Sequence, residues 1–215
     1  DGKALLKACA NGSSELMSNI SMSIVSMLYN AQLIRYAGED GIAAYGVLMY
    51  VSFVFSAIFI GYSTGVAPVV GFHYGAGSHT ELRSLYRKSL AITLTASAVM
   101  LALAEALARP FSAVFVSYDP GLFQMTVHAF AVYSFSFLFS GLAIFGSAFF
   151  TALNDGLTSA LISFLRTLVF QVGAVLALPL IWGIDGVWLS IVAAEVMAAL
   201  TTGAFLLGKR KKFHY

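Results

Sequence analysis

Charged residues are scarce in this chain: they make up 10% of its 215 residues, against 59% hydrophobic residues. Soluble domains carry about a quarter charged residues, so no water-soluble core is large enough to hold this much apolar surface. The net charge of +2 gives no electrostatic basis for binding nucleic acid. Proline occurs 4 times and glycine 19 times, which suits helices packed closely in a lipid bilayer. A membrane β-barrel is disfavoured, because it needs segments of about ten alternating residues and the apolar runs here are longer.

Features of enzymes and of disulfide-bonded proteins are also missing. The single cysteine, Cys9, excludes an internal disulfide. The sequence contains no phosphate-binding loop of the Walker type, no HExxH motif and no nucleophile elbow. We therefore predict a protein that is not an enzyme and that has no cofactor and no metal site. Because the chain begins with Asp1 and no signal peptide precedes its first apolar stretch, we interpret it as a piece of a longer protein.

Apolar stretches dominate what is present. Each of them reaches the roughly 20 residues that cross the hydrocarbon core of a bilayer, and turn-forming residues such as AGEDG at 37–41 and GIDG at 183–186 separate them. The sequence thus predicts an all-α integral membrane protein with a single domain of six transmembrane helices. Pro68 is expected to kink or end the second helix. The helices are expected at about 9–36, 42–72, 85–108, 122–153, 157–182 and 187–207.

The basic residues indicate how this bundle is oriented. With six helices both ends of the chain lie on one side of the membrane. Only Arg35 and Arg109 then fall on the opposite side, and Arg166 lies within the membrane. Because Lys and Arg are enriched in cytoplasmic segments, we expect both termini in the cytoplasm and the protein in the plasma membrane. The basic residues on the cytoplasmic side are Lys3, Lys7, Arg83, Arg87, Lys88, Lys209, Arg210, Lys211 and Lys212.

Two opposite charges lie deep in neighbouring helices. At about 1.5 Å of rise per residue, Arg166 in the fifth helix and Glu195 in the sixth both fall near the middle of the membrane. A buried charge costs at least a few kcal/mol in lipid unless it is paired or hydrated. We therefore predict an Arg166–Glu195 ion pair that faces the bundle. The pair is either a permanent structural element or a gate that breaks and reforms during transport.

A polar stripe follows the first helix. Its members are spaced four, four, three and four residues apart, so they share one face, and such a face cannot contact lipid. The stripe either lines a water-filled cavity, with the carboxylate of Glu15 as a proton or cation site, or holds helices together by hydrogen bonds. Glu15 also stands where a carboxylate would suit the first turn of a helix. The stripe consists of Glu15, Asn19, Ser23, Ser26 and Asn30.

Aromatic residues are abundant, and some of them are candidates to line a pocket for flat apolar cations. Tyr29, Tyr45, Tyr50 and Tyr62 are the tyrosines of the first two helices that we consider for this role.

Several motifs resemble one transporter family. The segment GYSTGVAPVVGFHYGAG (61–77), followed by Arg83, Arg87 and Lys88, resembles a proline-containing helix end in MATE (multidrug and toxic compound extrusion) transporters. FFTALNDGLTSALISFLR (149–166) and WGIDGVWLS (182–190) resemble two later helix junctions of that family, and NGSSELMSNIS (11–21) and EDGIAAYGV (39–47) resemble the opening of its second lobe. The order and spacing of the motifs are more specific than any one of them.

This resemblance implies one lobe, the C-terminal one, of a two-lobe transporter whose other lobe precedes it in the same polypeptide. Members of the family expel drugs and organic cations in exchange for H⁺ or Na⁺ and without ATP. Some members carry an acidic cation-binding residue closer to the position of Met22 than to Glu15, and the usual Gln before the proline is Ala67 here. The coupling ion therefore stays open. The alternatives are a flippase of lipid-linked oligosaccharides from the same superfamily and a non-transporting membrane scaffold or channel subunit.

Overall fold

The structure, a computed structural model, describes the backbone of residues 2–215 and the side chains of residues 2, 9 and 19–215. The side chain of Glu15 lies outside these described residues. Every described element is helical. The elements are α1 (Gly2–Gly75), α2 (His79–Val116), α3 (Pro120–Tyr133), α4 (Phe135–Ala152), α5 (Gly156–Phe164), the π-helix η1 (Leu165–Phe170), α6 (Gln171–Ala177) and α7 (Pro179–Phe213).

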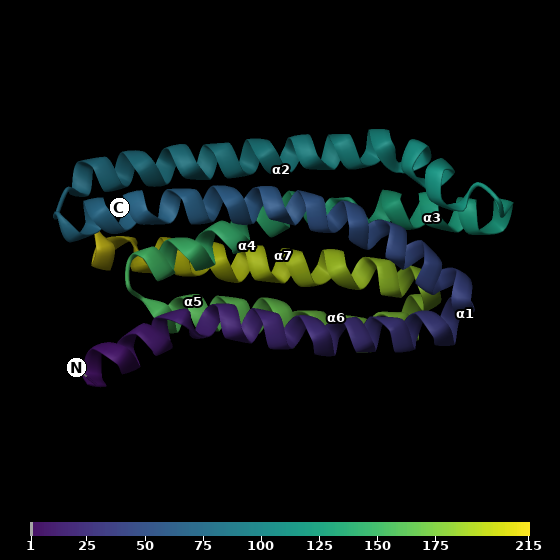
Figure 1. Ribbon diagram of the computed structural model, residues 1–215, viewed down its shortest axis with the longest axis horizontal. Coiled ribbons are helices and arrows are strands. Elements are labelled where there is room, and N and C mark those ends of the chain that lie inside the picture. The colour runs from purple at the N-terminus through teal and green to yellow at the C-terminus, as the bar shows by residue number, and fades with distance from the viewer. Residues whose placement is uncertain (1) are drawn as a thin grey trace.

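These elements run back and forth along one long axis (Figure 1). Five described helical stretches are long and apolar enough to cross a membrane. Because α1 and α7 each contain a break, the chain forms six antiparallel passes, and its two ends lie at the same end of the bundle in Figure 1. Large apolar side chains such as Phe53 and Leu207 stay exposed on the outside, where lipid rather than water is the matching solvent. The passes cover residues 2–37, 39–75, 79–116, 120–152, 156–182 and 184–213.

Single glycines produce the two breaks. Gly38 has φ 64° and ψ −148°, and Gly183 has φ 58° and ψ −130°. This backbone region is essentially open to glycine alone. Each break stands at the start of the same four-residue pattern, Gly-x-Asp-Gly, and a second glycine closes it: Gly41 packs against the preceding turn of α1, and Gly186 packs against the backbone of Leu178. The chain reverses direction at both places without a loop.

The helix bounds differ from the expected ones where proline or apolar loop residues occur. The segment after residue 108, expected as a connection, continues α2 through Pro110 to Val116, because it is rich in apolar side chains that suit a membrane helix. Pro68 does not end its helix: α1 continues past it to Gly75, and its only departure from helical φ and ψ is at Gly38. The fourth pass is interrupted at Ser134, between α3 and α4.

Helix α4 lies at the centre, in contact with α1, α2, α5 and α7. Its glycines allow this close packing: a side chain at Gly141 would meet Phe59 and Ser97, and one at Gly146 would meet Thr202. One buried apolar cluster surrounds Tyr29, Leu48 and Trp188. A second cluster, at the end that carries the termini, combines aromatic residues such as Phe149, Phe150, Phe213 and Tyr215 with aliphatic side chains of α1, α2, α5 and α7.

At the same end, α5 is tied to α7 through Asp155. Its carboxylate accepts hydrogen bonds from Lys209 Nζ at 2.6 Å and Thr158 Oγ1 at 2.8 Å, and Lys209 also contacts Thr158. Partial burial acts to raise the pKa of Asp155, but these hydrogen bonds and the positive charges of Lys209 and Lys212 lower it by more. The pKa of Asp155 is therefore below its ordinary value, which means that ionisation of this side chain stabilises the folded state relative to the unfolded state.

We expect Gly38→Ala and Gly183→Ala to destabilise the protein by about 1–3 kcal/mol each, because alanine cannot adopt these dihedral angles without strain. Gly61→Ala is the matched control: Gly61 lies within a regular part of α1, and nothing lies within 4 Å of where its Cβ would be. That substitution should be neutral or stabilising by up to about 1 kcal/mol. Thermal unfolding of the full-length protein in detergent measures the difference, and equal melting temperatures for all three variants would refute it.

We expect Asp155→Asn to lower stability at neutral pH by about 1 kcal/mol, since the substitution removes a partly buried ion pair with Lys209. A carboxyl group whose pKa is lowered by folding stabilises the protein above its unfolded pKa of about 4, and this contribution is lost as the pH falls through the lower folded pKa. The melting curves of the two proteins should thus converge on acidification. A constant gap between neutral pH and pH ~3 would contradict this account.

Candidate functional site

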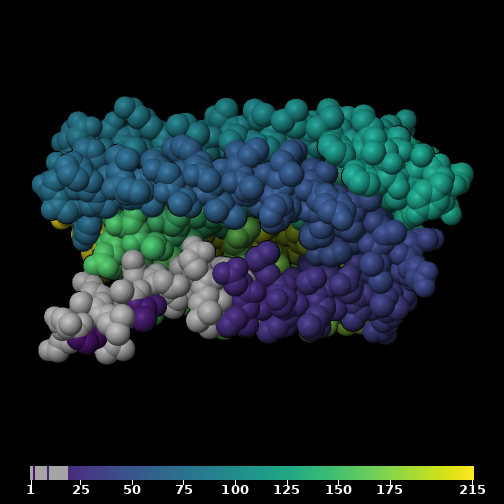
Figure 2. Space-filling view, in the orientation of Figure 1, coloured from purple at the N-terminus to yellow at the C-terminus, as the bar shows by residue number. Residues whose placement is uncertain are grey.

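A cavity of about 430 Å³ opens between the helices. Figure 2 shows the hollow between the two passes of α1, with later helices visible at its floor. Both passes of α1 line it, together with α3–α7, so residues far apart in sequence meet there. The polar residues of the lining are Asn19, Ser26, Tyr29, Tyr45, Ser52, Ser56, Ser63, Thr64, Tyr133, Ser136, Ser140, Ser147, Ser163, Arg166, Thr167, Gln171 and Glu195.

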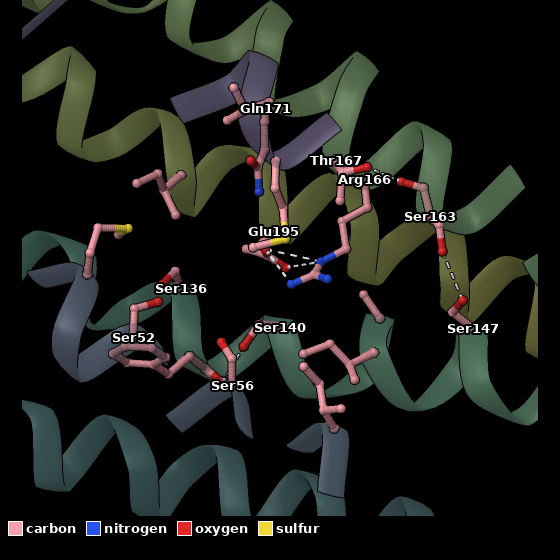
Figure 3. Close-up of a pocket in the computed structure, with 18 of the residues that line it drawn as sticks. Ser52, Ser56, Ser136, Ser140, Ser147, Ser163, Arg166, Thr167, Gln171 and Glu195 are labelled. Atoms are coloured by element: carbon pink, nitrogen blue, oxygen red, sulfur yellow. Dashed lines mark hydrogen bonds and ion pairs between the residues drawn. The ribbon is translucent and has the colours of Figure 1, made fainter. Parts of the chain in front are cut away.

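Arg166 and Glu195 meet at this cavity (Figure 3). The Arg166 Nε lies 3.1 and 3.0 Å from the two carboxylate oxygens of Glu195, and Nη2 lies 2.9 Å from Oε1. This two-pronged arrangement is the strong form of an arginine–carboxylate contact. The Glu195 side chain is 5% exposed and that of Arg166 is 21% exposed. The pair neutralises both charges where the membrane interior would otherwise penalise them.

The helix that carries Arg166 is locally irregular. Residues Leu165–Phe170 form a π-helix between α5 and α6, and such insertions are frequent at functional sites. An extra residue in a turn rotates the side chains on either side of it relative to a regular helix. Thr167 Oγ1 donates a hydrogen bond to the backbone oxygen of Ser163 at 2.6 Å. This hydrogen bond gives one backbone carbonyl next to the π-helix a side-chain partner. The π-helix positions both Arg166 and Thr167 at the cavity.

Next to the pair, hydroxyl groups of α4 and α5 form a chain. Ser147 Oγ lies 3.0 Å from Ser163 Oγ and 2.9 Å from Ser159 Oγ, and Ser159 Oγ lies 2.6 Å from Thr151 Oγ1. Thr151 also donates to the backbone oxygen of Ser147 at 3.1 Å. These contacts give the hydroxyl groups partners inside the protein, and they join α4 to α5 at the edge of the cavity.

The predicted stripe on the first helix only partly faces the cavity. Asn19 and Ser26 line it, whereas Ser23 and Asn30 do not. The inward face consists instead of Asn19, Met22, Val25, Ser26 and Tyr29, so it is rotated by a fraction of a turn from the stripe predicted from polarity alone.

Two of the four candidate tyrosines lie at the cavity. Tyr29 and Tyr45 stack on each other with ring centroids 5.5 Å apart, and the Tyr29 hydroxyl is 2.7 Å from Ser190 Oγ. Tyr50 instead stacks on Phe115 and is exposed, and Tyr62 donates to Ser89. Sequence reasoning missed Tyr133, whose hydroxyl lies 2.7 Å from Ser52 Oγ.

The hydroxyl-rich part of the lining was also missed. Ser136, Ser140 and Ser147 follow one face of α4, and their spacing of four and seven residues is the signal that could have identified them. Ser63 is buried and lines the cavity, yet its Oγ has no hydrogen-bond partner among the described residues. Nowhere in the described part of the chain do three or more His, Cys, Asp or Glu side chains gather as metal ligands would.

Comparison with known proteins shows which family and which solved structures the chain resembles. The family model MatE matches residues 16–177. The chain is similar in fold to a multidrug resistance MATE family transporter of the MOP superfamily in its outward-facing conformation, with 23% identity and a TM-score of 0.86. The match covers 98% of this chain and 47% of the chain of that transporter. No curated protein matches the sequence.

Two further solved structures show the same fold. A variant of the Vibrio cholerae MATE transporter VcmN has 17% identity and a TM-score of 0.89, over 99% of this chain and 49% of its own. A MOP superfamily transporter from Pyrococcus furiosus, described as having a binding pocket of reverse polarity that suggests a different function, has 23% identity and a TM-score of 0.85. That match covers 98% of this chain and 47% of the other. The chain spans about half the length of the structures it matches.

We expect Arg166→Gln to destabilise the protein by about 3 kcal/mol, because it leaves the buried Glu195 carboxylate without a compensating charge. Adding Glu195→Gln should recover more than half of this loss, since two neutral amides can hydrogen-bond to each other without a charge to desolvate. A double-mutant cycle of thermal unfolding in detergent measures the coupling. If the stability losses of the two single variants simply add up to the loss of the double variant, the contact between Arg166 and Glu195 does not stabilise the protein.

Proposed function

Because this chain belongs to the MatE family of membrane transporters, we propose that it forms one lobe of a secondary transporter that expels drugs and organic cations in exchange for H⁺ or Na⁺. The observation that carries the proposal is the polar cavity between the two passes of α1 and helices α3–α7. In transporters built from repeats, the substrate site forms between the repeats, and access alternates as one bundle rocks against the other. The cavity would be one wall of such a site.

The coupling step that we propose uses Glu195. Arg166 is the counter-ion of Glu195 in this structure. A proton, a Na⁺ ion or a cationic substrate that engages the carboxylate would replace the charge of Arg166, and the freed guanidinium would favour a different packing of α7 against η1. Two states that bind the ion with different affinity are what coupling requires. Glu15 remains a second candidate for such a role.

The partners and orientation follow from the same proposal. A second six-helix lobe of the same polypeptide would face the cavity and complete it. Both ends of this lobe would lie in the cytoplasm, where the basic residues near Lys88 and Lys209 would favour them, and the plasma membrane would hold the transporter.

The charge of the cavity favours a drug transporter over the lipid-linked oligosaccharide flippase. A flippase for a substrate with a charged phosphate linkage needs a basic cavity. Among the described residues that line this cavity, Arg166 is the only basic one, and Glu195 balances it. A scaffold without transport would have no need for this polar lining.

To test the proposal, the full-length protein, with its second lobe, is reconstituted in liposomes with a cationic fluorescent dye. An imposed H⁺ or Na⁺ gradient should drive saturable dye export, and an ionophore that collapses the gradient should stop it. Glu195→Gln should reduce the dependence on the ion about tenfold or more. The 215-residue lobe alone should be inactive, because it has no partner to rock against.

Gly61→Ala, which changes no cavity residue, is the control variant and should export dye as the unaltered protein does. Export that persists without any ion gradient, or gradient-driven export by the isolated lobe, would contradict the proposed function.

A further inference from the structure

Arg166 has more hydrogen-bond donors than its partner uses. A guanidinium carries five N–H groups in a planar fork and is always charged. Its Nε and Nη2 atoms are directed at Glu195. No described residue accepts a hydrogen bond from Nη1, and Nη1 is not among the fully buried atoms that lack a partner. One edge of the fork is therefore open to the cavity.

The pair is oriented so that its positive end meets the cavity. Glu195 is almost completely covered, at 5% exposure, and the Arg166 side chain keeps 21%. Figure 3 shows the guanidinium directed at Glu195, with Ser140 and Ser56 among the other side chains that line the same cavity. A solute in the cavity would thus meet N–H donors, while the carboxylate that could attract a cation is occupied by Arg166.

The open edge and the cavity around it are suited to a planar oxyanion. Ser56 and Ser140 line the same cavity, and hydroxyl groups of this kind can donate to an oxygen of a bound solute. Arginine binds carboxylates with two parallel hydrogen bonds, which are shorter and stronger than neutral ones. The same N–H groups would find no partner in an apolar or purely cationic solute, and a buried donor without a partner is costly.

We propose that the open edge of Arg166 is a subsite for an anionic group of the transported solute, so that among organic cations those that also bear a carboxylate bind most tightly. The proposal rests on the proposed transport function and specifies its substrate class. Glu195 acts here as a positioning residue: it holds the guanidinium by one edge and presents the other. A solute rather than a lipid is the occupant to which we commit, since the cavity lining carries many hydroxyl groups beside its apolar side chains.

The test compares two probes that differ only at the anionic group: a xanthylium dye with a free carboxylate and its methyl ester. Binding of each to the full-length protein is measured by fluorescence anisotropy in phosphatidylcholine nanodiscs, without any ion gradient. The free carboxylate should bind about tenfold more tightly than the ester, which is about 1.4 kcal/mol. This readout does not depend on transport, so a failure of ion-driven export would leave it intact.

Variants assign the preference to Arg166. In the double variant Arg166→Gln with Glu195→Gln the ratio of the two dissociation constants should fall to within about twofold, because both charges are gone while the side-chain volumes are kept. In Glu195→Gln alone the ratio should rise above that of the unaltered protein, since the positive charge is no longer balanced. Ser112→Ala, which removes a buried hydroxyl of α2 that bonds to Ala108 and lies away from the cavity, should leave the ratio unchanged.

Three results would overturn the proposal. One is equal binding of the acid and the ester by the unaltered protein. Another is a preference that persists in the double variant or fails to rise in Glu195→Gln. The third is a preference that disappears when phosphatidylglycerol replaces phosphatidylcholine in the nanodiscs, because an anionic headgroup rather than a solute would then occupy the subsite.

Discussion

The interior of a bilayer offers no water to a polar group, and this constraint shapes every part of the protein. Backbone groups must bond within their own segment, so the described chain is built from helices. Hydroxyl groups in the passes bond back to carbonyls of the preceding turn, as Ser112 does to Ala108 and Thr126 to Leu122. Charge at depth is tolerated where it is balanced, as in the Arg166–Glu195 pair. Many of the remaining polar side chains line the cavity.

Much of the architecture could be predicted because it follows from lengths and positions along the sequence. The lengths of the apolar runs locate the passes, and matched depth alone brings Arg166 beside Glu195. Register about a helix axis is harder to predict. Polarity pointed to Ser23 and Asn30 on the first helix, but the inward face is rotated toward Met22 and Tyr29, because contacts with later helices decide which side is covered.

The remaining features depend on deviations from ideal helices that leave little trace in the sequence. The π-helix at Leu165–Phe170 has no residue pattern that sets it apart, yet it determines which side chains of this pass reach the cavity. Pro68 likewise does not end its helix, since α1 continues past it to Gly75 with helical φ and ψ. In contrast, the glycines at 38 and 183 occur in a repeated pattern, Gly-x-Asp-Gly, that marks both reversals.

The reversal at Gly183 also bears on how the protein enters the membrane. It joins the pass that carries Arg166 to the pass that carries Glu195 as a hairpin with almost no connecting loop. Inserted one at a time, each arm would bring an unbalanced charge into lipid at a cost of a few kcal/mol. Inserted together as a hairpin, the arms can pair their charges before either reaches the hydrocarbon core. The tight turn therefore makes these two passes a natural unit of insertion during biosynthesis, with the salt bridge formed within a single hairpin rather than between independently inserted helices.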